Sequence, residues 1–185
     1  MRAGPDLRRL LQQRVSVTAL AWAHELGDAL LAPPPLGFPG SLMNGEPGIA
    51  LFLAYLGQRG SDPRYTEGAE RLLDEAFALA GELGPFLHDG FTGAAWTLEH
   101  LAGRVLAPSE GDPNEDCDAA VAEVLARPVE LQDAGDLMFG AAGLAVYLLE
   151  RGRDPSSVLG GAAGVGLVLL DLAPGWDRIF LTDLA

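Results

Sequence analysis

Four segments of the chain share one pattern of small and large apolar residues. Each contains Gly-x-x-Gly, then a small residue two positions later and a leucine three positions after that, within residues 43–56, 88–101, 138–151 and 159–172. After the glycines the residues are apolar nearly all round, which is typical of helices buried on most sides. The pattern predicts four inner helices of a repeat.

Segments of a different kind lie between these repeats. Residues 62–83 carry apolar residues at helical spacing with charges on the other face. Asp62 is expected to cap this helix, with Pro63 in its first turn. Residues 114–127 show the same scheme over a shorter length, with acidic residues at the start. Both segments are predicted to form outer helices.

The N-terminal part is helical by the same criteria. Residues 5–32 form one long helix or two, and Pro33-Pro34-Pro35 stops the helix. No run alternates apolar and polar residues as a strand would. The predicted fold class is therefore all-α. Alternating inner and outer helices predict a helical solenoid or a closed α/α toroid.

The repeats resemble the lanthionine synthetase C-like family. The resemblance rests on residues 45–56, on 136–149, and on 161–170 followed by Trp176-Asp-Arg178, and it runs from about Ser41 to the end of the chain. It implies an α/α toroid whose inner helices begin with Gly-x-x-Gly. We expect one domain over 1–185, with an N-terminal helical segment at 1–35 and incomplete toroid repeats at 41–185.

The resemblance also implies a chemistry. Members of the family are peptide cyclases: zinc binds a substrate cysteine as the thiolate, which adds to a dehydrated serine or threonine to form a thioether. The family's zinc ligands are two cysteines and a histidine, one cysteine directly preceding the histidine. This sequence has no Cys-His pair and one cysteine, Cys117. We therefore expect no zinc or other cofactor, and a catalytically impaired protein.

The spacing of the repeats also predicts that the zinc ligands are absent. Their first glycines are Gly45, Gly90, Gly140 and Gly161, so the last interval is much shorter than the others and has no room for an outer helix. The third segment resembles the family's third repeat and the fourth its last. The chain is expected to lack the middle repeats, where the zinc ligands belong.

One site residue follows from the resemblance. In the family, an aspartate four positions before the first glycine of the third inner helix lies in the active site and is proposed to assist proton transfer, and Asp136 stands at that position. Its simpler interpretation is a helix cap. His88 is a weaker acid/base candidate, with Asp89 beside it and a plain loop histidine as the alternative.

The other metal-binding residue types show no ligand spacing. His24 and His100 fall on apolar helices, where histidines are commonly packed or at the surface. Cys117 lies in an acidic first turn, which is expected to raise its thiol pKa and keep it unreactive.

Charge and composition exclude several functions. The net charge of -14 disfavours nucleic acid. All 12 basic residues are arginine, which excludes Schiff-base lysine chemistry. The most apolar stretch, 158–170, is shorter than a membrane span, and a single cysteine and no signal-peptide pattern favour the cytoplasm.

Several functions remain open. The first is a lanthionine synthetase C-like protein without cyclase activity, and its rival is a non-catalytic module that binds a precursor peptide or a lanthipeptide synthetase partner. An enzyme of another class using Asp136 with His88, and a gene remnant, are further alternatives. An incomplete ring is expected to favour homodimers by exposing inner-helix side chains, namely those of Leu144, Val146, Val165 and Leu167.

Overall fold

The computed structural model describes residues 7–108, 111–126 and 136–152, with side chains from residue 17 onward. These residues form six α-helices, one short 3₁₀ helix and no strand, so the predicted all-α class is confirmed. The elements are α1 (Leu7–Leu30), α2 (Glu46–Gly60), α3 (Pro63–Ala78), η1 (Ala80–Glu82), α4 (Phe91–Leu101), α5 (Glu115–Ala126) and α6 (Ala141–Glu150).

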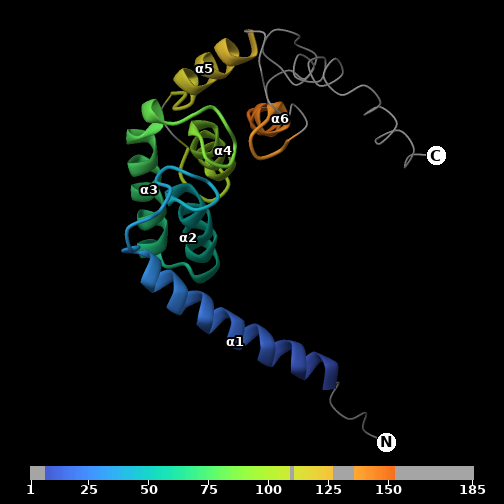
Figure 1. Cartoon of the computed structure of the whole chain (residues 1–185). Helices are drawn as coiled ribbons and strands as arrows, with labels where there is room; N and C mark the ends of the chain where they lie inside the picture. The colour runs from blue at the N-terminus through green and yellow to red at the C-terminus, as the bar shows by residue number, and fades with distance from the viewer. Residues whose placement is uncertain (1–6, 109–110, 127–135, 153–185) are drawn as a thin grey trace, which may run out of the picture.

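The N-terminal segment is a single long helix, α1. It ends at Leu30, shortly before the three prolines, which cannot donate backbone hydrogen bonds. Figure 1 shows α1 extending from one end of the molecule, with its C-terminal part next to α2 and α3. Neither α1 nor any other helix in the described ranges is long and apolar enough to cross a membrane. The apolar stretch 158–170 lies outside these ranges.

Three of the four predicted inner helices are present as α2, α4 and α6. Their N-caps are Gly45, Gly90 and Gly140, the first glycines of the repeat, all with extended backbone. The fourth predicted inner helix, 159–172, lies outside the described residues.

The second glycine of each repeat allows a close approach of neighbouring backbone. A Cβ at Gly48, Gly93 or Gly143 would collide with the carbonyl oxygen of the residue six positions earlier. At Gly93 and Gly143 that Cβ would also lie 2.9 Å from the Cβ of Leu42 and of Leu87, respectively, in the loop of the preceding repeat. Glycine is therefore required for the repeats to stack at this distance.

The outer helices are α3 and α5. Asp62 caps α3 as predicted, its carboxylate accepting from Arg64 N at 3.1 Å, and Pro63 occupies the first turn. The helix ends at Ala78 and continues as the 3₁₀ turn η1, whereas a helix to Leu83 was predicted. Gly81 and Gly84 have low helix propensity and weaken this last turn.

The helices follow an arc, as Figure 1 shows, with α1 at one end and α5 and α6 at the other. The inner helices pack side by side in the order α2, α4, α6, while α3 packs against α2 and α4, and α5 against α4. One apolar core joins α2 and α3 around Leu53 and Leu72, and a second joins α4, α5 and α6 around Val121 and Tyr147.

The expectation that Leu144 is exposed is wrong, because its side chain is fully buried. Leu144 lies on the same stripe of α6 as the buried Ala141 and Leu148, which belong to the second core. Val146 is partly buried. Val165 and Leu167 fall beyond the described residues.

Candidate functional site at the start of the inner helices

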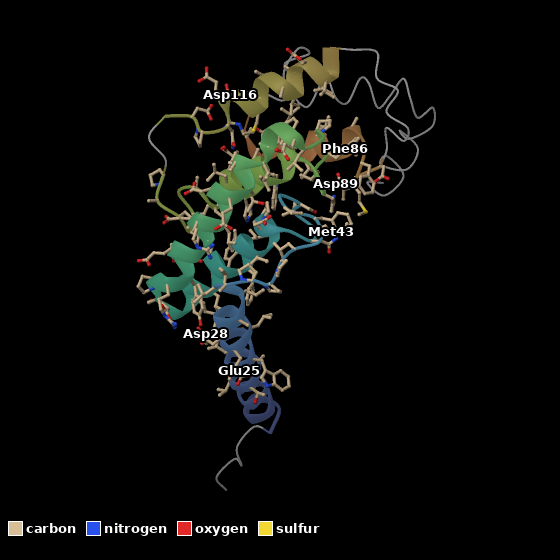
Figure 2. The ribbon with its side chains drawn as sticks, turned by 60° about the vertical axis from the view of Figure 1, so that its left-hand side comes forward. Glu25, Asp28, Met43, Phe86, Asp89 and Asp116 are labelled. Atoms are coloured by element: carbon tan, nitrogen blue, oxygen red, sulfur yellow. The ribbon has the colours of Figure 1, made fainter. Side chains whose placement is uncertain are left out.

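The loops that lead into the three inner helices are joined side by side. Met43, His88 and Met138 each stand two positions before the first glycine of their repeat. Met43 N donates to His88 O at 3.1 Å, and His88 N donates to Met138 O at 3.5 Å. Figure 2 shows Met43, Asp89 and Phe86 along one edge of the molecule. This loop edge, residues 41–45, 86–90 and 136–140, contains both predicted site residues.

Asp136 holds the turn of its own loop. Its Oδ1 accepts hydrogen bonds from Met138 N at 2.7 Å and Phe139 N at 3.4 Å. Ser41 stands at the same position of the first repeat, and its Oγ accepts from Met43 N at 3.2 Å and Asn44 N at 3.3 Å. The two side chains thus stabilise the same turn, as short oxygen-bearing side chains do. Asp136 caps a turn, while the N-cap of the helix itself is Gly140.

His88 is partly buried, and its Nδ1 atom has no hydrogen-bond partner within the described structure. Asp89 is exposed. No hydrogen bond joins the His88 ring to Asp89 or to Asp136 in the part of the chain described here. The backbone hydrogen bonds between neighbouring loops therefore bring the loops of His88 and Asp136 together. The two side chains do not form an acid/base pair.

Apolar side chains surround these polar groups. Phe86 and Phe139 form an edge-to-face pair with ring centroids 6.0 Å apart. Met43, Leu137 and Phe139 remain 46%, 49% and 44% exposed, although all three are large and apolar. The loop edge therefore presents an apolar surface with a carboxylate and an imidazole within it.

The remaining histidines and the cysteine lie apart from the loop edge. His24 Nδ1 is 3.2 Å from Tyr65 Oη, between α1 and α3. Cys117 is buried in the core of α5, and burial, assisted by Asp118 and Asp116, raises the pKa of its thiol to about 11. The expected direction of this pKa shift is confirmed, but burial, more than the acidic turn, causes it.

The residues present do not fit a zinc site of the family type. A thiol with a raised pKa is a poor source of thiolate, and no three His, Cys, Asp or Glu side chains within the described ranges are grouped as metal ligands. All four His and Cys residues of the sequence fall in those ranges.

A row of polar side chains connects the inner helices toward their C-terminal ends. The sequence analysis did not predict this row. Tyr55 Oη is 2.8 Å from His100 Nε2, and His100 Nδ1 is 3.2 Å from Glu150 Oε1. Each residue stands ten positions after the first glycine of its repeat, on α2, α4 and α6 in turn. Aligning the repeats places three polar residues at this position, but only the packing of neighbouring repeats brings them into contact.

A second cluster surrounds Arg151, whose side chain is 7% exposed. Its guanidinium contacts Glu99 at 2.6 Å, Asp112 at 2.6 Å and Asp118 at 2.6 Å. The hydrogen bond to Asp118 is the main cause of the raised pKa of Arg151, and burial and a hydrogen bond to Asp118 raise the pKa of Tyr147. This cluster ties α4, α5 and α6 together and is structural.

Comparison with known proteins identifies the family. No curated protein and no solved structure matches the chain significantly. The family "Lanthionine synthetase C-like protein" matches residues 38–155, which include every inner and outer helix described here. The match ends before residues 161–178, a shorter range than the sequence resemblance predicted. The chain belongs to the lanthionine synthetase C-like family.

Proposed function

We propose that this protein is a lanthionine synthetase C-like protein that binds peptides at its loop edge but does not by itself form thioether rings. The observation that supports it most directly is Asp136, the one residue matching the family's active site. Its Oδ1 is already engaged by two backbone amides, in the same turn that Ser41 makes in another repeat. The presence of an aspartate at position 136 is thus explained by its role in this turn, without a catalytic role.

The donor set supports the loss of the cyclase reaction. Activation of a substrate thiol by zinc needs protein ligands that leave one coordination position open. Cys117 is buried in the α5 core, and His100 is engaged by Tyr55 and Glu150. Neither residue is at the loop edge with Asp136 and His88.

Peptide binding is supported by the surface of the loop edge. Large exposed apolar side chains that lie close together mark interaction sites. Met43 and Phe139 come from loops that are joined through the His88 backbone. The partner expected here is a precursor peptide, or the lanthipeptide synthetase that carries it.

The cyclase part of the proposal is tested with the purified protein after washing with a chelator. Zinc is measured per chain by elemental analysis, and a peptide with one dehydroalanine and one cysteine is incubated with protein and zinc. Mass spectrometry after thiol alkylation then shows whether the cysteine has been consumed. We expect no bound zinc and full alkylation. Stoichiometric zinc with a protected cysteine would overturn the proposal.

The binding part is tested with the same peptide carrying a fluorescent label. Phe139→Ser is expected to weaken binding in an anisotropy titration. Leu149→Ser is the matched control, because Leu149 is 61% exposed near the opposite end of α6. Equal affinities of the two variants would contradict binding at the loop edge.

A second candidate function is acid/base catalysis by Asp136 with His88. It is favoured by one observation, the buried His88 Nδ1 that has no partner in the described structure. A ligand group could satisfy this atom only if the His88 side chain moved to expose it. In this case Asp136→Asn abolishes turnover, while the protein remains folded.

Homodimerisation that completes a ring is also proposed, since an arc leaves inner-helix surface uncovered. Sedimentation equilibrium at micromolar concentration tests it. A single species with the mass of one chain contradicts it.

A further inference from the structure

A pocket of about 660 Å³ lies between α1, α2 and α4, and none of its lining residues belongs to the loop edge. This volume is in the range of small-molecule sites. It extends along α2 from Gly48 to Arg59, about 16 Å at the rise of an α-helix. Its walls are mainly apolar, formed by Ala19, Leu20, Ala23, Leu51, Phe52 and Leu56.

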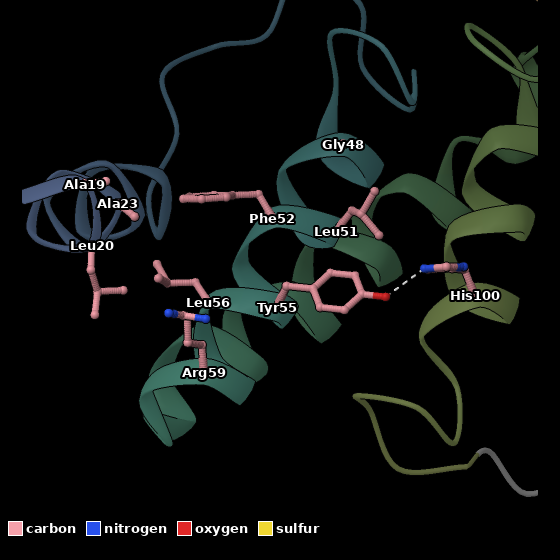
Figure 3. A pocket seen from close by; sticks show the side chains of 10 residues that line it. All are labelled: Ala19, Leu20, Ala23, Gly48, Leu51, Phe52, Tyr55, Leu56, Arg59 and His100. Carbon is pink, nitrogen blue, oxygen red and sulfur yellow. Dashed lines mark hydrogen bonds between the residues drawn. The ribbon is translucent and has the colours of Figure 1, made fainter. Parts of the chain in front are cut away.

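The polar groups of the pocket lie on two sides: Figure 3 shows Arg59 beside Leu56 on the side of α1, and the Tyr55 hydroxyl pointing the other way, toward His100 of α4. Tyr55 and Arg59 are one turn apart on α2 and so share a face of the helix. His100, on α4, contacts Tyr55 alone of these two, with its Nε2 2.8 Å from Tyr55 Oη. Trp96 stacks on the His100 ring at a centroid distance of 4.8 Å. The Tyr55–His100 pair is therefore held in place by two inner helices, and Arg59 is the polar group on the α1 side of the pocket.

Arg59 differs from the other arginines whose side chains are described. Arg64, Arg71, Arg104 and Arg151 each pair with at least one carboxylate. Arg59 makes no such pair within the described ranges, in a sequence with 26 acidic and 12 basic residues. An exposed cation without a protein partner at the rim of an apolar pocket is suited to a ligand anion.

We propose that this pocket binds a small organic acid with an apolar tail, its carboxylate at Arg59 and its tail along Leu20, Leu51 and Phe52. A single negative charge matches the single cation of the pocket. A polyanionic peptide would be repelled by a protein with a net charge of -14, and the volume fits one small molecule. The site is distinct from the loop edge and does not depend on the proposed function.

The test compares sodium octanoate with 1-octanol, which have equal chain lengths but differ in the charged group. Binding is followed by calorimetry and by the fluorescence of the tryptophans, at fixed ionic strength and below micelle-forming concentrations. We expect saturable binding of octanoate, weakened at least about tenfold by Arg59→Gln, because a charged hydrogen bond is lost. Octanol binding should be unchanged by this variant.

Arg71→Gln is the matched control, because Arg71 is an exposed arginine of α3 paired with Glu75. Leu20→Asp, on the α1 wall, is expected to weaken both ligands. Phe139→Ser should leave octanoate binding intact, which separates this site from the loop edge.

Three outcomes overturn the proposal. They are the absence of saturable octanoate binding, equal octanoate affinity of Arg59→Gln and Arg71→Gln, and Arg59-dependent binding of an apolar peptide with one glutamate but not of octanoate. The last outcome would make the pocket a peptide site. Circular dichroism of each variant shows that the helices are retained.

Discussion

Gly143, in the first turn of α6, lies directly against Leu87 of the preceding repeat, so that a Cβ at residue 143 would be 2.9 Å from the Leu87 Cβ. Gly93 has the same relationship to Leu42, one repeat earlier. The spacing between repeats is therefore set by contacts between a glycine and the loop before it.

Gly143→Ala is expected to destabilise the protein by about 1–3 kcal/mol, because the added methyl group must displace the carbonyl group of Leu137 and the side chain of Leu87. Gly81→Ala is the control, since a Cβ there has open space around it. The free energy of unfolding in urea measures both. A Gly143→Ala variant as stable as the Gly81→Ala variant would show that the repeats can separate without cost.

Arg151→Gln is expected to cost about 3 kcal/mol at neutral pH, because it leaves Glu99, Asp112 and Asp118 close together without their cation. Arg71→Gln, which breaks an exposed pair, should cost less than about 1 kcal/mol. Thermal unfolding monitored by circular dichroism gives the comparison. Equal melting temperatures for the two variants contradict a structural role of the Arg151 cluster.

The same cluster predicts a pH dependence. The hydrogen bond from Arg151 lowers the pKa of Asp112 below its ordinary value of 3.8. Its contribution to stability is thus complete above that value and is lost as the pH falls through the lower folded pKa. In Arg151→Gln the three carboxylates repel one another, and their protonation relieves this on acidification. The difference in melting temperature between wild type and variant should therefore narrow as the pH falls below 3.8.

Cys117 is expected to react slowly with a disulfide reagent in the native protein. A thiol pKa of about 11 leaves about one thiolate in a thousand at pH 8, and the side chain is buried. The rate should rise by more than about a hundredfold in denaturing urea, when the thiol returns to its ordinary pKa. Cys117→Ser serves as the blank. Rapid reaction of the folded protein is the result that contradicts this prediction.

Asp136→Asn, Asp136→Ser and Asp136→Ala separate the structural role of this residue from a chemical one. Asn and Ser keep an oxygen that accepts the amides of Met138 and Phe139, so their stability should stay near wild type. Ala leaves these amides without their acceptor and is expected to cost about 1 kcal/mol. If turnover of any substrate depends on the carboxylate, all three variants lose it, whatever their stability.

The helices could be predicted because their signals are local. The glycine N-caps, the Asp62 cap and the proline stops each lie within a few residues of the end they determine. The end of α3 was predicted five residues too late, since its apolar spacing continues through Gly81. The spacing of apolar residues gives no information on how strongly Gly81 and Gly84 destabilise the last turn of the helix.

The candidate site was less accessible to sequence reasoning. The role of Asp136 in its turn could have been predicted from Ser41, because Asp and Ser make the same turn. Phe86 obscured this equivalence; in that repeat Thr92 Oγ1 donates instead to Pro85 O. The row from Tyr55 through His100 to Glu150 and the burial of Leu144 depend on how neighbouring repeats face each other, which the pattern within one repeat does not determine.

The backbone ladder of the loop edge makes the architecture modular. Met43 N donates to the carbonyl of His88, which stands two positions before the first glycine of its repeat. His88 N donates to the carbonyl of Met138, at the same position of the next repeat. Because the donor and acceptor positions recur, removing the repeat that contains His88 would present Met138 O to Met43 N. Such a fold can shorten or lengthen by whole units while each remaining unit keeps the same kind of neighbour. The number of repeats in this architecture can thus change by recombination of gene segments, without new contacts having to evolve.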